Sequence, residues 1–92
     1  MTDKKSTSLV KIDENLVPPA PWERQDGESA MAFSAFVVYR DLPPTERNHE
    51  AVRDLLYPQA PWSIDRIKQW SSEFKWVART EAWVAKVDTE RR

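Results

Sequence analysis

The stretch that decides the fold, SIDRIKQWSSEF, runs from Ser63 to Phe74. Its apolar residues Ile67, Trp70 and Phe74 recur at +3 and +7, which is the spacing of one face of an α-helix. The serine that opens the stretch is a favoured N-cap residue, because its hydroxyl can accept a hydrogen bond from a backbone N–H of the first turn. The sequence therefore predicts an amphipathic helix over residues 64–74.

Three further helices are expected around this stretch. The segment from about Glu28 to Leu42 has apolar residues at helical spacing and ends at a Pro-Pro pair. The segment from about His49 to Leu56 follows Asn48, a good N-cap residue. A fourth helix begins at about Val77, after a kink near Lys75-Trp76, and residues 88–92 are expected to fray. No strand-like alternation of useful length occurs, so the predicted fold class is all-α, a small bundle of three to four helices.

The N-terminal part of the chain differs in composition from the rest. Leu, Ile, Val and Phe make up 5 of the first 27 residues but 14 of the 60 residues from 28 to 87, so the folded core is expected to begin late. Residues 1–27 are predicted to form a flexible tail and a Pro-rich arm, and residues 28–87 to form the domain. The arm carries the pattern Pro-x-Ala-Pro-Trp at 18–22, which recurs at 58–62. Its prolines favour an extended backbone, and Trp22 is expected to pin it to the domain.

The composition removes support for most enzyme classes. The 92 residues carry 14 Lys or Arg and 15 Asp or Glu, a net charge of −1, with one glycine, one histidine and no cysteine. Without cysteine there is no thiolate zinc site or cysteine nucleophile, and with Gly27 alone there is no glycine-rich phosphate loop. His49 has no second imidazole with which to share a metal or a proton, and it is expected at the surface. We expect a non-enzymatic protein without a cofactor.

The predicted third helix is the candidate DNA-reading element. Three short helices of which the third is amphipathic fit the helix-turn-helix plan of a homeodomain-like bundle, in which that helix enters the major groove. Residues 62–92 carry seven basic and five acidic residues, the only positive balance along the chain. Arg66 and Gln69 lie one turn apart and can make bidentate contacts with guanine and adenine edges, whereas Asp65 and Glu73 repel the DNA backbone. The predicted DNA-binding residues are Arg66, Lys68, Gln69, Ser72, Lys75 and Arg79, of which Lys68, Lys75 and Arg79 are expected to meet phosphates.

A longer pattern resembles a known family. It consists of Glu28-x4-Phe33-x2-Phe36-x2-Tyr39-Arg40-x-Leu42, then Glu46-Arg47-x4-Val52, and then Ser63-x3-Ile67-x2-Trp70-Ser71-x2-Phe74-x-Trp76-x2-Arg79-x3-Trp83. Over about residues 22–83 this resembles the helix-turn-helix region of phage terminase small subunits and related phage DNA-binding proteins. The resemblance implies recognition of double-stranded DNA by the third helix, in viral genome packaging or as a prophage regulator. It also implies a large packaging ATPase or another phage protein as a partner.

Two features depart from the family. Its members usually add an oligomerisation segment that builds a ring, and the nine residues after Trp83 are too few for one. The connection Tyr57–Trp62 is longer than the usual turn, which changes the expected angle between the two helices it joins. A monomer this acidic is expected to bind DNA weakly, so a homo-oligomer or attachment to a larger assembly is expected to supply the affinity.

Two other functions remain open at this stage. A protein-interaction adaptor or inhibitor could present Trp22, Trp62 and the Pro-rich arm on the helical scaffold, and the acidic balance favours it. A hydrolase with a carboxylate-bound metal would need three or more converging acidic residues, and no spacing indicates them. No apolar run is long enough to cross a bilayer and the N-terminus lacks the apolar stretch of a signal peptide, so a cytoplasmic location is expected, in the host cell if the protein is of phage origin.

Overall fold

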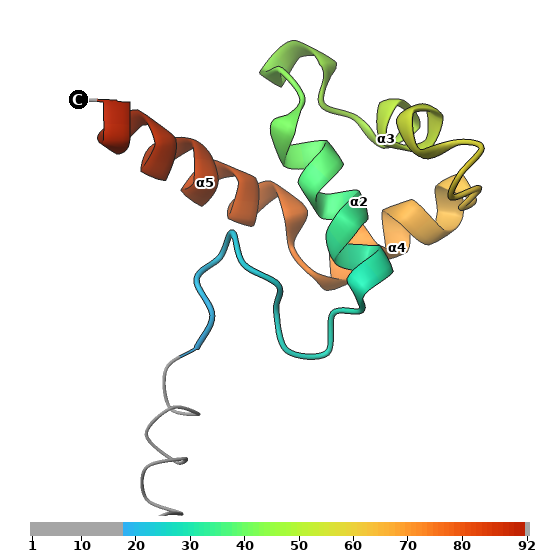
Figure 1. The fold of residues 1–92 in the computed structure, drawn as a ribbon, viewed down its shortest axis with the longest axis horizontal. Coiled ribbons are helices and arrows are strands. Elements are labelled where there is room, and N and C mark those ends of the chain that lie inside the picture. The colour runs from blue at the N-terminus through green and yellow to red at the C-terminus, as the bar shows by residue number, and fades with distance from the viewer. Residues whose placement is uncertain (1–17, 92) are drawn as a thin grey trace, which may run out of the picture.

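The computed structural model describes residues 18–91, and within this range the chain is helical with no strand (Figure 1). The helices α2, α3 and α4 pack on one another, and α5 packs on α2 and α4 before its C-terminal half extends away from the bundle (Figure 1). The predicted small all-α bundle is thus confirmed. The elements are α2 (Ala30–Asp41), the short 3-10 helix η1 (Pro44–Glu46), α3 (His49–Leu56), α4 (Ile64–Glu73) and α5 (Trp76–Arg91).

Three side chains cap the N-termini of the bundle helices. The Ser29 hydroxyl accepts a hydrogen bond from the backbone N–H of Ala32, and the helix α2 therefore begins two residues later than Glu28, where it was predicted. Asn48 caps α3 in the same way, and Ser63 accepts from the backbone N–H of Arg66 to cap α4. Each cap satisfies an N–H group that has no partner within its own helix. The caps predicted at Asn48 and Ser63 are confirmed.

Arg47 closes the C-terminal end of α2. Its guanidinium donates hydrogen bonds to the backbone carbonyls of Tyr39, Arg40 and Leu42, at 3.3, 3.2 and 2.7 Å. The last carbonyls of a helix have no helical partner, and a cation beside them also favours the helix dipole. Together with Pro43, which cannot continue the helix, Arg47 fixes where α2 stops and the chain turns toward α3.

Two residues, Phe74 and Lys75, connect α4 to α5. Phe74 ends α4, and Lys75 has a φ of 52°, in the left-handed region that non-glycine residues rarely adopt. The helix α5 then starts at Trp76, so the kink predicted near Lys75-Trp76 is a complete break between two helices. We call Lys75 the elbow. Because the connection is only two residues long, the direction of α5 follows from the backbone angles of Phe74 and of the elbow.

The core lies where α2, α3, α4 and α5 meet. Its largest fully buried apolar side chains are Trp76, Phe36, Ile67 and Val52, one from each of these helices. The Trp76 ring lies 6.2 Å from the Phe36 ring and 5.1 Å from the Tyr39 ring, between centroids. A buried tryptophan removes on the order of 150–250 Å² from water, a large contribution for a domain this small.

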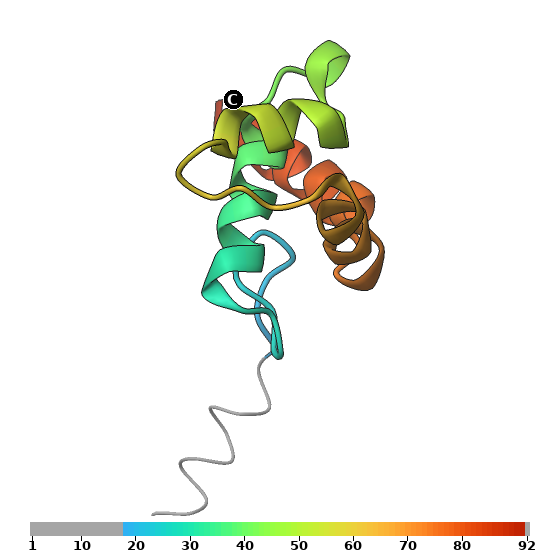
Figure 2. The same ribbon diagram turned by 90° about the vertical axis from the view of Figure 1, so that its right-hand side faces the viewer.

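The position of His49 needs correction, and the structure adds detail at both ends of the described chain. The helix α5 continues through Arg91, and the Lys86 and Glu90 side chains form an ion pair one turn apart in its last part. The fraying expected for residues 88–92 stays a prediction. His49 is half-buried rather than at the surface, because its ring stacks on Tyr39 with centroids 6.3 Å apart. The predicted flexible N-terminal part includes residues 18–27, which fold back beside the beginning of α2 (Figure 2) and which we call the arm. Residues 1–17 lie outside the described residues.

Candidate nucleic-acid interface

One face of α4 is anchored in the core. Ile67 is fully buried and Trp70 is 8% exposed. The Trp70 ring also meets the Trp62 ring in an edge-to-face contact, with centroids 5.3 Å apart and planes at 73°. Such aromatic pairs stabilise by about 0.5–1.5 kcal/mol beyond their buried area. These contacts hold α4 at both its first and its last turn, so its opposite face is presented in a fixed orientation.

The opposite face of α4 carries the polar residues that the sequence predicted there. Arg66, Lys68, Gln69 and Ser72 are all exposed. Among the residues that the structure describes, none of the four side chains has an ion pair or a hydrogen-bond partner. The Arg66 guanidinium carbon lies 5.9 Å from the centroid of the Trp70 ring, which restrains the Arg66 side chain from one side. Asp65 and Glu73 are exposed on the same helix, so the face carries both signs of charge.

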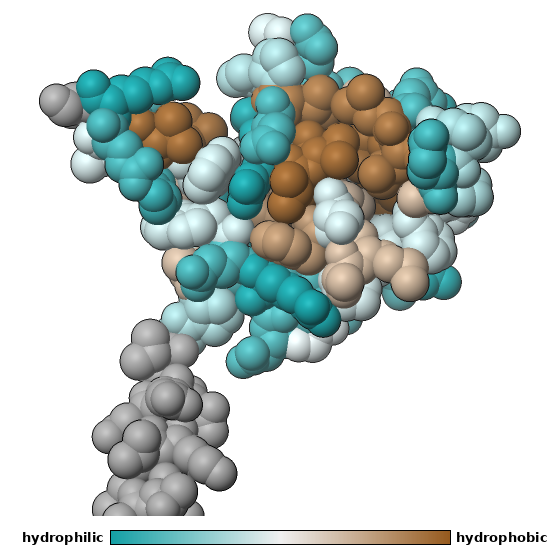
Figure 3. All heavy atoms as spheres, viewed as in Figure 1, coloured by the Kyte–Doolittle hydropathy of each residue, from teal (hydrophilic) through white to brown (hydrophobic). Residues whose placement is uncertain are grey.

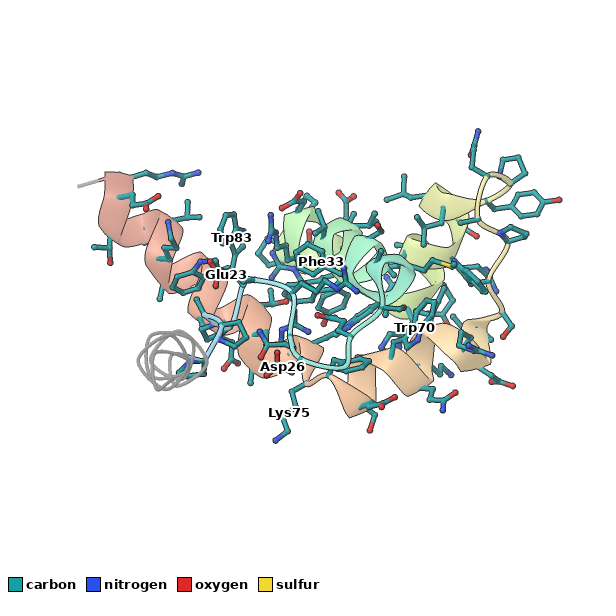
Figure 4. All side chains as sticks on the ribbon, turned by 60° about the horizontal axis from the view of Figure 1, so that its bottom comes forward. Glu23, Asp26, Phe33, Trp70, Lys75 and Trp83 are labelled. Carbon is teal, nitrogen blue, oxygen red and sulfur yellow. The ribbon has the colours of Figure 1, made fainter. Side chains whose placement is uncertain are left out.

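Lys75 adds a cation at the C-terminal end of this face. Its side chain is exposed and points away from the bundle into solvent (Figure 4). The elbow conformation of Lys75 costs about 1–2 kcal/mol for a residue with a Cβ. Within residues 18–91 the ammonium group of Lys75 has no carboxylate partner, so it is available to an external anion.

The expectation that Arg79 meets a phosphate is wrong. Arg79 is only 5% exposed, and its guanidinium forms a buried ion pair with the two carboxylate oxygens of Glu28, each at 3.0 Å. The group also lies 3.9 Å from the centroid of the Phe36 ring. No hydrogen-bond donor of Arg79 remains for an external ligand, because its other N–H groups are bonded to backbone carbonyls.

These carbonyls belong to the arm and to the end of α4. The Arg79 Nε donates to the carbonyl of Pro21 at 2.7 Å, and its two terminal nitrogens donate to the carbonyls of Glu23 and Phe74, each at 3.1 Å. Glu28 in turn accepts a hydrogen bond from the backbone N–H of Gln25. We call this set of contacts the Arg79 clamp. It ties the arm, the C-terminus of α4 and α5 together at one point.

The two tryptophans that an adaptor would display are both packed on the domain. The backbone carbonyl of Trp22 accepts a hydrogen bond from Arg40, and the Lys86 ammonium lies 5.5 Å from the Trp22 ring centroid. Trp62 is half-buried against Trp70. The structure thus confirms that Trp22 pins the arm to the domain, and it leaves neither ring free to serve as a projecting anchor.

Sequence reasoning missed the roles of Glu28 and Arg79. A signal was present, because Arg79 lies three residues after Trp76 and four before Trp83, on the apolar side of α5. Glu28 could not be recognised as its partner, since the two residues are 51 positions apart. Residues 18–91 contain no group of three His, Asp or Glu side chains that could hold a metal ion. None of their helices is long and apolar enough to cross a membrane.

Comparisons with known proteins give no relative of this chain. No family model, no curated protein and no solved structure matches it.

Proposed function

We propose that this protein binds double-stranded DNA through the exposed face of α4. The observation that carries the proposal is that α4 is held on one side by Ile67 and Trp70 while Arg66 and Gln69 stand exposed, one turn apart, on the other. A helix held in this way can be placed in the major groove as a rigid body. Arg66 would then read guanine and Gln69 adenine, each through a bidentate contact.

The cations beside this pair suit the phosphate backbone. Lys68 and Lys75 are exposed, and the Ser72 hydroxyl is exposed between them in sequence. Phosphate contacts of this kind set the position of a protein on the duplex, whereas base contacts set its sequence preference. With Lys68 and Lys75 as the cations that meet phosphates, the logarithm of the affinity is expected to fall with the logarithm of salt at a slope of about −2.

The charges on α3 indicate from which side the DNA approaches. Glu50 and Asp54 lie one turn apart on α3 and are exposed, and Glu46 is exposed in η1 just before it. An acidic surface repels phosphates, so the duplex is expected to contact α4 without lying across the outer face of α3. In this arrangement the C-terminal end of α4 and the elbow lie closest to the DNA backbone.

The resemblance to phage terminase small subunits supports a role in viral genome packaging or in prophage regulation, in the cytoplasm of the host cell. In the first role a large packaging ATPase would be the protein partner. The match in residue pattern includes Trp70-Ser71 through Arg79, and the structure places Arg79 in a structural role. The DNA contact of the proposal therefore depends on Arg66, Lys68, Gln69, Ser72 and Lys75 alone.

Fluorescence anisotropy with a labelled duplex tests the proposal. Random and phage-derived duplexes are titrated with protein at about 50 mM and about 200 mM salt, where phosphate contacts lose affinity steeply. Arg66→Ala is expected to weaken binding by about 1–3 kcal/mol. Arg53→Ala on α3 is the matched control, because it removes the same charge from a side chain that is 41% exposed and paired with Asp54.

The proposal predicts salt-sensitive binding that Arg66→Ala weakens and Arg53→Ala leaves nearly unchanged. If the wild-type protein binds neither duplex at the lower salt concentration, DNA binding is excluded and an adaptor role is favoured. An equal loss of DNA affinity in Arg66→Ala and Arg53→Ala would mean that α4 contributes no more to DNA binding than α3 does.

A further inference from the structure

One side of α2 carries apolar residues that the core covers only in part. Val38 and Leu42 follow Met31 at +7 and +11, which places the three side chains on one side of the helix. Met31 is 57% exposed, and Val38 and Leu42 are half-buried. An apolar stripe at this spacing that remains open to solvent is typical of a helix that packs on another helix.

The helix α3 extends this apolar surface. Tyr39 lies one turn before Leu42 on α2, and its ring stacks on His49, so α3 runs beside the same side of α2. Leu55 of α3 is 60% exposed, and Leu56 is half-buried. Figure 3 shows apolar atoms in one continuous area over α2 and α3. We call the residues of this area the apolar face: Met31, Val38, Leu42, Leu55 and Leu56.

The most exposed charges of α2 and α3 are acidic. The Asp41 side chain at the end of α2 is 57% exposed, whereas its partner Arg40 is 17% exposed. On α3 the Asp54 side chain is 71% exposed and its partner Arg53 is 41% exposed. Glu50 is exposed one turn before Asp54, and it forms no ion pair with another residue of the range 18–91. The apolar face therefore has an acidic rim, formed by Asp41, Glu50 and Asp54.

We infer that the apolar face binds a basic amphipathic helix of another protein. Lysine or arginine beside an apolar stripe on the partner complements both the face and its acidic rim, whereas a second copy of this chain would bring two acidic rims together. Residues 18–91 contain no strand, so they offer no sheet edge to an extended peptide.

The length of the stripe sets the size of the partner. At 1.5 Å per residue the stripe from Met31 to Leu42 is about 17 Å long, so about three turns of a partner helix cover it. This interaction goes beyond the proposed DNA binding, and its test uses no DNA.

Fluorescence anisotropy of a labelled synthetic peptide tests the inference. The probe has about 15 residues, with leucine at i, i+3, i+4 and i+7 spacing and lysine at the other positions. Its counterpart carries glutamate in place of every lysine. Titration with the full-length protein is expected to show saturable binding of the lysine peptide and binding of the glutamate peptide that is weaker by about tenfold or more.

Two pairs of matched variants locate the contact. Leu55→Ser is expected to weaken binding of the lysine peptide about tenfold, whereas Val77→Ser, at an equally exposed residue of α5, is expected to leave it unchanged. Glu50→Lys reverses a charge of the acidic rim and is expected to weaken binding about fivefold, whereas Glu81→Lys makes the same change on α5 and is expected to have no effect. Circular dichroism checks that the four variants remain folded.

Several results would overturn the inference. They are the absence of saturable binding, equal affinity for the two peptides, and an equal loss of affinity in Leu55→Ser and Val77→Ser. Sedimentation equilibrium tests the other occupant, because a wild-type dimer that Leu55→Ser dissociates would assign the apolar face to a second copy of this chain instead.

Discussion

Replacing Arg79 is expected to destabilise the domain and to detach the arm from it. The Arg79 clamp contains five hydrogen bonds, two to the Glu28 carboxylate and three to backbone carbonyls. Lysine keeps the charge but has three donors on one nitrogen, so Arg79→Lys leaves at least two acceptors without a partner. A buried acceptor left unpaired costs about 1–3 kcal/mol, and water can reach part of the exposed arm. We therefore expect Arg79→Lys to lower the free energy of unfolding by about 2–3 kcal/mol.

Arg79→Met is the stronger form of the same test. Methionine removes the cation and leaves the Glu28 carboxylate, whose side chain has no exposed surface, without a counter-charge. Breaking a buried ion pair in this way costs about 3–5 kcal/mol. Since the free energy of unfolding of a native protein is about 5–15 kcal/mol, this variant is expected to be only marginally stable. The order of stability is thus wild type, Arg79→Lys, Arg79→Met.

Urea denaturation followed by circular dichroism measures these differences. Hydrogen exchange adds a local readout, because the backbone N–H groups of Gln25 and Glu28 are bonded within the clamp and the arm. Both are expected to exchange faster in Arg79→Lys, whereas Arg53→Lys, at an ion pair on the surface of α3, is expected to change stability by no more than about 0.5 kcal/mol. The reasoning is refuted if Arg79→Met unfolds within about 1 kcal/mol of the wild type.

Two smaller effects follow from the cap and the elbow of α4. Ser63→Ala removes the acceptor for the backbone N–H of Arg66 and is expected to cost about 1 kcal/mol in urea denaturation, whereas Ser72→Ala, on the exposed face, serves as the control without a cap. Lys75→Gly relieves the left-handed backbone and is expected to stabilise the domain by up to about 1 kcal/mol. In the anisotropy titration the same variant is expected to bind DNA more weakly and to reduce the salt slope by about one, and an unchanged slope would remove Lys75 from the interface.

The parts of the fold that depend on near neighbours in sequence could be predicted. Asn48 and Ser63 each cap a helix by accepting a hydrogen bond from a backbone N–H only three residues further along the chain. Ile67 and Trp70 are buried at the spacing of a helix within a single stretch. Such signals are local, and no tertiary contact contradicts them here. The exposed positions of Arg66 and Gln69 follow from the same period, since they lie on the side opposite the buried residues.

The parts that depend on distant partners could not be predicted. The sequence predicts a phosphate contact for Arg79, but its partner Glu28, 51 positions away, is brought to it only by the folding of the arm. His49 was expected at the surface, and it is half-buried because Tyr39 of another helix lies beside it. The left-handed backbone of Lys75 could not be predicted from the sequence, because glycine or asparagine is the usual residue in this conformation at the end of a helix.

The short connection at the elbow leaves little freedom between α5 and the helix that would read DNA. A linker of several residues would let α5 turn relative to α4, whereas Phe74 and Lys75 hold the two helices at one angle. In the proposed complex, the direction in which α5 leaves the duplex would therefore be set by the protein itself.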